Sequence, residues 1–261
     1  MKKRIISVIV LLSILGICVF ASEASRIAIF CIAGILCAYE YSKRLSEKNI
    51  TVTSWILYAY LIIQFILSLT HCGRTAYIAW FAAAVYLAMF SGILHRKVDG
   101  KGAIFTASAL AYPCFPFALM MIIVSSQRVW ETLALSCIPC WICDAFALFG
   151  GMLFGKHKFA PHVSPNKTIE GCLTGALFSV LAGFCVSFLF KEIPLYVCLI
   201  TAFVSSTAGQ IGDLSESLLK RYLEIKDFSN LIPGHGGMFD RADSLMFAIP
   251  TAYLCLYLFG L

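Results

Sequence analysis

Long apolar runs separated by short polar segments make up most of this chain. The runs do not alternate as barrel strands do, and backbone groups in lipid must be paired within their own segment, so helices are expected. Most runs have the roughly 17 to 25 residues that a helix needs to cross a hydrocarbon core. They lie near residues 5–22, 52–70, 75–94, 103–125, 129–150, 172–190, 193–211 and 244–261, with a shorter one at 27–41. The pattern predicts an all-α, polytopic integral membrane protein with about nine transmembrane helices.

The composition excludes a soluble domain. Only 13% of the 261 residues are charged and 60% are hydrophobic, and the mean hydropathy is +0.87, whereas soluble domains carry roughly 25% charged residues. The net charge of +6 does not indicate nucleic acid binding, because the basic residues are divided among short loops. It indicates a membrane surface or an anionic substrate instead.

The distribution of Lys and Arg predicts which loops face the cytoplasm, since cytoplasmic loops are enriched in these residues. With the N-terminus inside, 16 of the 20 basic residues fall on the inside and 4 on the outside. The inside residues lie at 2–4, 43–48, 96–101, 156–167 and 220–241. We therefore expect a protein of the bacterial inner membrane with its polar site facing the cytoplasm. If the first run is instead a cleaved signal peptide, eight spans remain with the same sidedness.

The two halves of the chain differ in character. Residues 1–128 are apolar spans joined by short loops, with no internal charge beyond Glu40 near a span end, which suggests a scaffold in contact with lipid. In residues 129–261 polar residues enter the spans, and two longer loops, 155–171 and 212–243, fall on the cytoplasmic side. We expect the second half to be the catalytic transmembrane region.

The segment before and within the first long loop contains two candidate features. Asp144 lies within or at the end of a span, where a carboxylate is costly and is either functional or hydrogen-bonded to a neighbouring helix. The motif SPNKT supplies Ser164, Asn166, Lys167 and Thr168 on a backbone that its proline holds extended. It fits an anion clamp, although a generic polar loop would look the same.

The second long loop begins with a predicted helix over 213–223. Asp213, Ser217 and Lys220 then fall at positions i, i+4 and i+7 of one face, with Arg221 beside them. A solvated amphipathic helix is the alternative interpretation of this piece.

Glycines dominate the end of that loop. Pro233 and Gly234 break any helix, and Gly236 and Gly237 carry no Cβ to obstruct a close approach of the backbone to a ligand. His235 lies between them, as a phosphate contact, a structural hydrogen-bonding group, a metal ligand or an acid–base group.

Several aspartates near one cytoplasmic interface, with cations among them, indicate a divalent cation held against a polyphosphate. Simple ion pairing needs neither the glycine turn nor a second loop rich in Lys and Ser, and an ion relay would spread carboxylates across span midpoints. Hard oxygen ligands suit Mg²⁺, which is bound through one or two carboxylates and substrate phosphates. Zinc is disfavoured because no HExxH or Cys/His set is present.

The run SLLKRYLEIKDFSNLIPGHGGMFDRAD, residues 217–243, closely resembles the signature of phosphatidate cytidylyltransferases, also called CDP-diacylglycerol synthases. That signature reads S-x-x-K-R, four residues, K-D, then H-G-G-x-x-D-R-x-D. Asp144 and HVSPNKTIEG are similar to the preceding segment of the family. Ala242 departs from the larger apolar residue usual there, which affects local packing, and residues 1–128 resemble the family only in hydropathy.

The resemblance implies transfer of a cytidylyl group from CTP to phosphatidic acid at the bilayer surface, with Mg²⁺ and with a second, monovalent cation such as K⁺ as an option. A homodimer is a candidate assembly. The implied metal ligands are Asp144, Asp213, Asp240 and Asp243. The implied catalytic and phosphate-contacting residues are Lys167, Ser217, Lys220, Arg221, Lys226, Asp227, His235 and Arg241, where Asp227 is also a candidate ion-pair partner for a Lys or Arg. The implied substrate-binding residues are Ser164, Asn166, Thr168, Gly236 and Gly237.

Two other functions compete with this hypothesis. A CTP-dependent membrane enzyme acting on another lipid, such as a prenol kinase or an ether-lipid cytidylyltransferase, would share a cation-rich loop. A secondary transporter of an anion would not consume CTP.

Overall fold

The structure, a computed structural model, describes residues 22–94, 98–231 and 236–261. Contacts divide the chain into two units. The first comprises the chain up to Ser126 together with the returning segment Ile225–Arg241, and the second comprises Gln127–Glu224 and Ala242–Leu261. The division after Ser126 lies next to the one that the polar pattern suggests at residue 128, while Ile225–Arg241 packs with the first unit.

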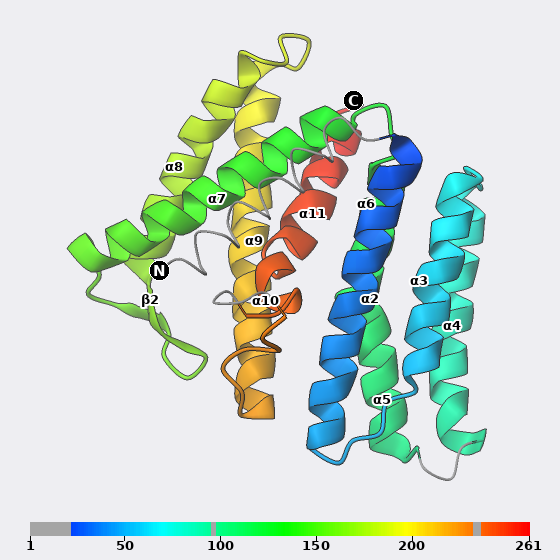
Figure 1. Cartoon of the computed structure of the whole chain (residues 1–261). Coiled ribbons are helices and arrows are strands. Elements are labelled where there is room, and N and C mark those ends of the chain that lie inside the picture. Colours follow the sequence, from blue (N-terminus) through cyan, green and yellow to red (C-terminus); the bar gives the residue numbers. More distant parts are fainter. Residues whose placement is uncertain (1–21, 95–97, 232–235) are drawn as a thin grey trace. The chain divides into compact units, whose positions relative to one another are not determined.

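The first unit is a bundle of helices that run side by side (Figure 1). It contains α2 (Glu23–Glu47), α3 (Ser54–Leu69), α4 (Arg74–Leu94), α5 (Gly100–Ala109), the π-helical turn η1 (Leu110–Cys114) and α6 (Phe115–Ile123). The predicted span over 103–125 is thus interrupted, because Tyr112 has non-helical dihedral angles (φ −153°, ψ 106°) and Pro113 lacks an N–H.

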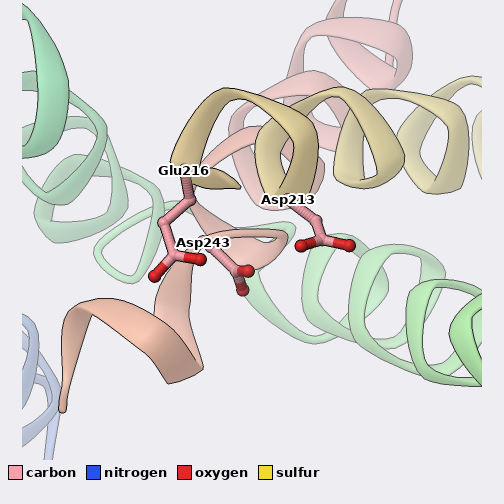
Figure 2. A group of neighbouring side chains, drawn as sticks. All are labelled: Asp213, Glu216 and Asp243. Atoms are coloured by element: carbon pink, nitrogen blue, oxygen red, sulfur yellow. The ribbon is translucent and has the colours of Figure 1, made fainter. Parts of the chain in front are cut away.

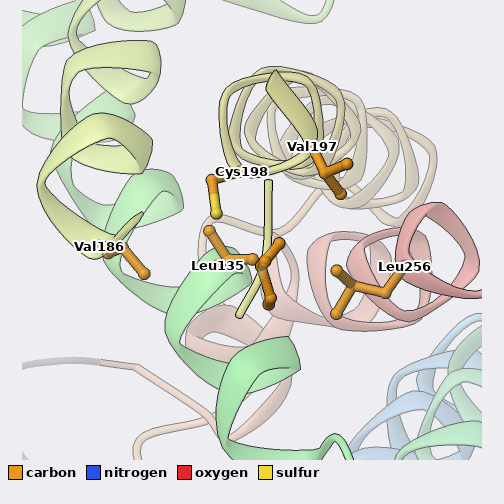
Figure 3. Packing of buried hydrophobic residues seen from close by; sticks show 6 residues of the cluster. Leu135, Val186, Val197, Cys198 and Leu256 are labelled. Carbon is orange, nitrogen blue, oxygen red and sulfur yellow. The ribbon is translucent and has the colours of Figure 1, made fainter. Parts of the chain in front are cut away.

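In the second unit, helix α7 (Val129–Phe154) packs most extensively against α8 (Ile169–Ser187), and α9 (Leu195–Leu223) contacts α7, α8 and α11 (Leu245–Leu258). The short helix α10 (Phe239–Ala242) spans the boundary between the units. Figure 3 shows the packed centre of the second unit, where Leu135, Val186, Val197 and Leu256 meet from α7, α8, α9 and α11. In lipid, whose tails are as apolar as these side chains, close van der Waals packing of this kind holds the helices together.

The expectation of an all-α fold needs one local correction. The first long loop forms a two-stranded antiparallel sheet of β1 (Lys158–Ala160) and β2 (Ser164–Thr168), with Lys158 opposite Thr168. Pro165 favours the extended backbone that β2 requires. The motif SPNKT therefore forms the second strand of a β-hairpin, directly before α8.

Six of the described helical stretches, with α5, η1 and α6 counted together as one, are long and apolar enough to cross a membrane. The helical membrane-protein character is thereby confirmed, whereas nine spans stay a prediction. All of the first predicted span, 5–22, except residue 22 lies outside the described residues. The short apolar run at 27–41 is the centre of a 25-residue helix, since its polar flanks are helical too. The last predicted span, 244–261, contains only the 14 helical residues of α11.

Candidate active site

The C-terminal part of α9 carries several of the predicted site residues. The helix continues without a break from its apolar part, so the predicted helix over 213–223 is confirmed. Asp213, Ser217 and Lys220 therefore share one face of the helix. Lys220 and Arg221 occupy the last turn, where cations interact favourably with the negative end of the helix dipole.

Three carboxylates gather beside this part of α9. Asp213 and Glu216 extend from the helix and Asp243 from the segment before α11, as Figure 2 shows. One oxygen atom from each lies within 4.8 Å of the others. Glu216 is almost completely buried, with 1% exposure. The cluster contains two of the predicted metal ligands and adds Glu216, which the sequence did not single out.

Gly212 explains how Asp243 comes so close to α9. A Cβ atom added to Gly212 would lie 2.5 Å from the backbone oxygen of Asp243 and 2.9 Å from the ring of Phe247. Only glycine permits this approach of one backbone to another. The N–H of Ser244 donates to Oδ1 of Asp243 at 2.7 Å, which orients the carboxylate.

Burial and a neighbouring negative charge oppose the ionisation of Asp243. Burial, followed by the negative charge of Asp213, raises the pKa of Asp243 to about 7. Burial and a like charge both disfavour the ionised form of an acid. A bound cation would reverse this effect, so the cluster has the electrostatic character of a cation site.

Three cations surround the cluster or tie its elements together. Lys167, on β2, forms an ion pair with Asp213. Nζ of Lys220 lies 2.6 Å from Oε2 of Glu216 within α9. Nε of Arg221 donates to the backbone oxygen of Val163 at 3.0 Å, and thereby connects the end of α9 to the hairpin.

A cavity of about 440 Å³ lies beside Asp213 in the second unit. Its polar lining comes from Asp144 of α7, from Gln210 and Asp213 of α9, and from Asn166, Lys167 and Thr168 of β2. Ala147, Leu148, Met152 and Cys172 supply the apolar part. The cavity therefore combines an apolar wall with convergent polar groups, as ligand sites do.

The predicted substrate-binding residues of SPNKT have different positions. Asn166 and Lys167 line the cavity, whereas Ser164, at the start of β2, is not among the lining residues. The hydroxyl of Thr168 accepts the N–H of Gly171 at 3.2 Å and caps α8. Thr168 thus stabilises the helix as well as facing the cavity.

The remaining predicted residues belong to the returning segment of the first unit. Lys226, Asp227 and Arg241 are exposed, and His235 lies outside the described residues. Oδ2 of Asp240 accepts the N–H groups of Phe228 at 3.0 Å and Gly237 at 2.6 Å. Asp240 therefore organises its own loop, and its place in a metal-ligand set stays a prediction.

Gly237 has a hydrogen-bond partner within the protein, and its role in substrate binding stays a prediction. We expected the backbone N–H groups of Gly236 and Gly237 to approach a phosphate, and Gly236 does adopt a positive φ of 83°. The N–H of Gly237, however, donates to Asp240. A Cβ atom on Gly237 would lie 2.5 Å from Oε2 of Glu40. The close approach that this glycine permits is to a protein carboxylate.

Comparison with known proteins identifies the family of this chain. A family model described as "Cytidylyltransferase family" matches residues 2–259. The chain belongs to the cytidylyltransferase family.

This family member is similar to several curated proteins named phosphatidate cytidylyltransferase. It is 42% identical to the protein of Bacillus subtilis over 128 residues, which are 48% of this chain and 47% of that one. It is 43% identical to a protein of Staphylococcus epidermidis over 117 residues, 44% of this chain and 45% of the relative. It is 38% identical to one from Staphylococcus aureus over 117 residues, with the same coverage. The chain thus aligns with about half the length of the curated relatives that it matches.

Two site residues of this cytidylyltransferase-family protein were missed from the sequence. Glu216 lies three residues after Asp213 and four before Lys220, so helical periodicity already placed it near both. Gln210 lies in the apolar part of α9, and its Nε2 donates to Sγ of Cys143 at 2.8 Å and to the backbone oxygen of Cys172 at 3.3 Å. A polar side chain inside an apolar span is the signal that could have identified it.

Proposed function

We propose that this protein transfers a cytidylyl group from CTP to phosphatidic acid and gives CDP-diacylglycerol and diphosphate. The observation that carries the proposal is the acidic cluster of Asp213, Glu216 and Asp243, which adjoins a cavity that Lys167 lines. Membership of the cytidylyltransferase family and similarity to proteins named phosphatidate cytidylyltransferase support this substrate pair.

The reaction requires positioning and charge neutralisation more than acid–base chemistry. A phosphate oxygen of phosphatidate attacks the α-phosphorus of CTP, the bond from that phosphorus to the bridging oxygen breaks, and diphosphate leaves. The attacking oxygen is already an anion, so no strong general base is needed. The protein must hold two anions in line and compensate their charge.

We propose that Asp213, Glu216 and Asp243 bind Mg²⁺, because carboxylate oxygens within 4.8 Å of one another, one of them on a buried and two on half-buried residues, are suitable hard ligands. The ion would polarise the phosphoryl oxygens and neutralise their charge. Asp144, which lines the adjoining cavity, is a further candidate for the ligand set. The assignment of Asp240 as a metal ligand stays a prediction from the family resemblance. A second, monovalent cation such as K⁺ stays a prediction from the family resemblance.

In the proposal, some cationic residues contact phosphate oxygens directly and others add positive charge. Lys167 faces the cavity from β2 and Lys220 is held by Glu216, so both are preorganised for phosphate oxygens. Arg221, Lys226 and Arg241 would contribute further positive charge. Ser217, on the same helical face as Lys220, would contact the substrate through its hydroxyl.

Gly212→Ala tests the role of the close contact between α9 and the segment before α11. The new methyl group would displace Asp243 from Asp213, and a displacement near 1 Å can reduce turnover about 100-fold. We expect this loss in the rate of diphosphate release, with the protein still inserted and folded. Gly100→Ala is the matched control, since a Cβ atom there meets nothing within 4 Å. Equal activities of the two variants would contradict the proposed geometry.

We further propose nine spans in the inner membrane, an active site facing the cytoplasm, and a homodimer as the assembly. This orientation is supported by the basic residues, because 16 of the 20 Lys and Arg residues fall on the predicted inside and 4 on the outside. The prediction is that single cysteines at positions 158 and 230, both exposed, resist an impermeant thiol reagent on intact cells. They should react once the membrane is permeabilised. Ready labelling of both in intact cells would reverse the orientation.

The decisive assay mixes purified protein with CTP, phosphatidate and Mg²⁺ and measures diphosphate and the CDP-lipid. The proposal requires both products in equal amounts. Release of CDP with a phosphorylated prenol would indicate a prenol kinase, and product from an ether lipid alone would indicate another cytidylyltransferase. Anion flux without CTP consumption would indicate a transporter.

A further inference from the structure

Helix α2 contains a buried carboxylate that binds the returning segment of the first unit. Glu40 has 2% exposure, and its Oε1 accepts the hydroxyl of Ser229 at 2.6 Å and the N–H of Met238 at 3.0 Å. Its Oε2 accepts the N–H of Phe239 at 2.9 Å. These donors are 189, 198 and 199 residues away in the sequence. Glu40 therefore joins the start of the unit to its end.

A second anchor lies one helical turn further along α2. Nε of Arg44 donates to the backbone oxygen of Phe228 at 2.6 Å, and Nη2 donates to that of Asp227 at 3.4 Å. Charge-assisted hydrogen bonds of this kind are about twice as strong as neutral ones. The two ends of the segment 227–239 are thus attached to one helix.

The described parts of this segment, residues 227–231 and 236–239, are also joined to each other. Asp240 accepts N–H groups from Phe228 and Gly237, on either side of the loop. The ring of Phe239 stacks on Phe228, with centroids 4.3 Å apart, and meets the edge of Tyr112 at 5.2 Å. Such contacts hold these described parts of the segment against α2.

These contacts fix the backbone beside three charged residues that the family resemblance assigns to the catalytic site. Lys226 and Asp227 directly precede the anchored Phe228, and Arg241 directly follows Asp240. The charged groups of Lys226, Asp227 and Arg241 are oriented toward a substrate reproducibly when this backbone is held in place. The apolar half of the chain thus contributes more than the scaffold that its sequence suggests.

We propose that Glu40 is a positioning residue for cytidylyl transfer, which acts by anchoring the segment that carries Lys226, Asp227 and Arg241. This inference rests on the proposed function. A carboxylate suits the place because it offers only acceptors to three donors. In Glu40→Gln, an NH₂ group replaces one oxygen, so a donor would face a donor of the segment. A buried donor without an acceptor destabilises the local arrangement.

The test compares three variants with a control. The variants are Glu40→Gln, Ser229→Ala and the double variant that carries both substitutions, and the control is Gln64→Leu. Gln64 is a matched control because it has 1% exposure in the same unit and donates to Ser68 within α3. We expect Glu40→Gln to lower kcat by about 10- to 100-fold, the range seen when an outer-shell partner is lost. Ser229→Ala should lower it less, and the double variant should be no worse than Glu40→Gln. Gln64→Leu should retain the kcat of the parent at equal folded fraction.

Hydrogen exchange separates this inference from the proposed function. The amides of Met238 and Phe239 should exchange faster in Glu40→Gln, while the exchange of the α3 amides is unchanged. This expectation does not depend on which substrate the protein converts. A parent protein that does not convert CTP and phosphatidate refutes the proposed function alone. Unchanged exchange in Glu40→Gln overturns the anchoring. Faster exchange with an unchanged kcat, or a kcat that falls only with the folded fraction as in Gln64→Leu, overturns the positioning role.

Discussion

Replacing Asp243 or Asp213 by Asn is expected to reduce cytidylyl transfer by about 100- to 1,000-fold, the range for loss of one preorganised electrostatic group. Asn keeps the size of the side chain but removes the negative charge. The two aspartates lie with Glu216 in one cluster, and the pKa of Asp243, which burial and Asp213 raise to about 7, shows the charge crowding that a cation would relieve.

The measurement is diphosphate release over a range of Mg²⁺ concentrations, together with the thermal midpoint with and without Mg²⁺. A ligand that binds the folded state raises the midpoint, so the parent should be stabilised by the ion and the variants should lose this response. Glu192→Gln is the control, because it removes an exposed carboxylate of the same unit. Normal turnover and a normal response to Mg²⁺ in both variants would remove the cluster from the mechanism.

Lys167→Ala is expected to lower kcat/KM for CTP by about 100-fold or more, as for other fixed charges that stabilise a transferring phosphoryl group. Lys167 faces the cavity and forms an ion pair with Asp213. Its loss removes a phosphate contact and leaves the acidic cluster with less compensation. Lys167→Arg should retain part of the activity, since Arg keeps the charge but not the geometry of Lys.

The control for this prediction lies in the same hairpin. Lys158→Ala removes an equal charge from the partner strand, at an exposed position. Steady-state rates with CTP varied at saturating phosphatidate distinguish the variants. If Lys158→Ala and Lys167→Ala lose the same activity, the effect is a general one of surface charge and Lys167 has no specific role.

Local sequence predicted the helices well because lipid leaves an apolar run few alternatives. The predicted helix over 213–223 is present, since its helical period was visible in the spacing of Asp213, Ser217 and Lys220. Hydropathy did not reveal helix ends. It missed the polar flanks of α2 and the interruption at Tyr112, where the backbone departs from helical geometry.

The sequence by itself determined the helical membrane character, the sidedness hypothesis and the family, because length, hydropathy, charge and a motif of fixed spacing are properties of the linear chain. Only the tertiary structure decided which residues meet. It brought Glu216 to Asp243, because Gly212 lets two backbones touch. It also brought Glu40 to residues almost 200 positions away, and gave the N–H of Gly237 to Asp240. The contacts of Asp243 and Glu40 depend on how segments distant in sequence pack against one another, and no local pattern encodes that packing.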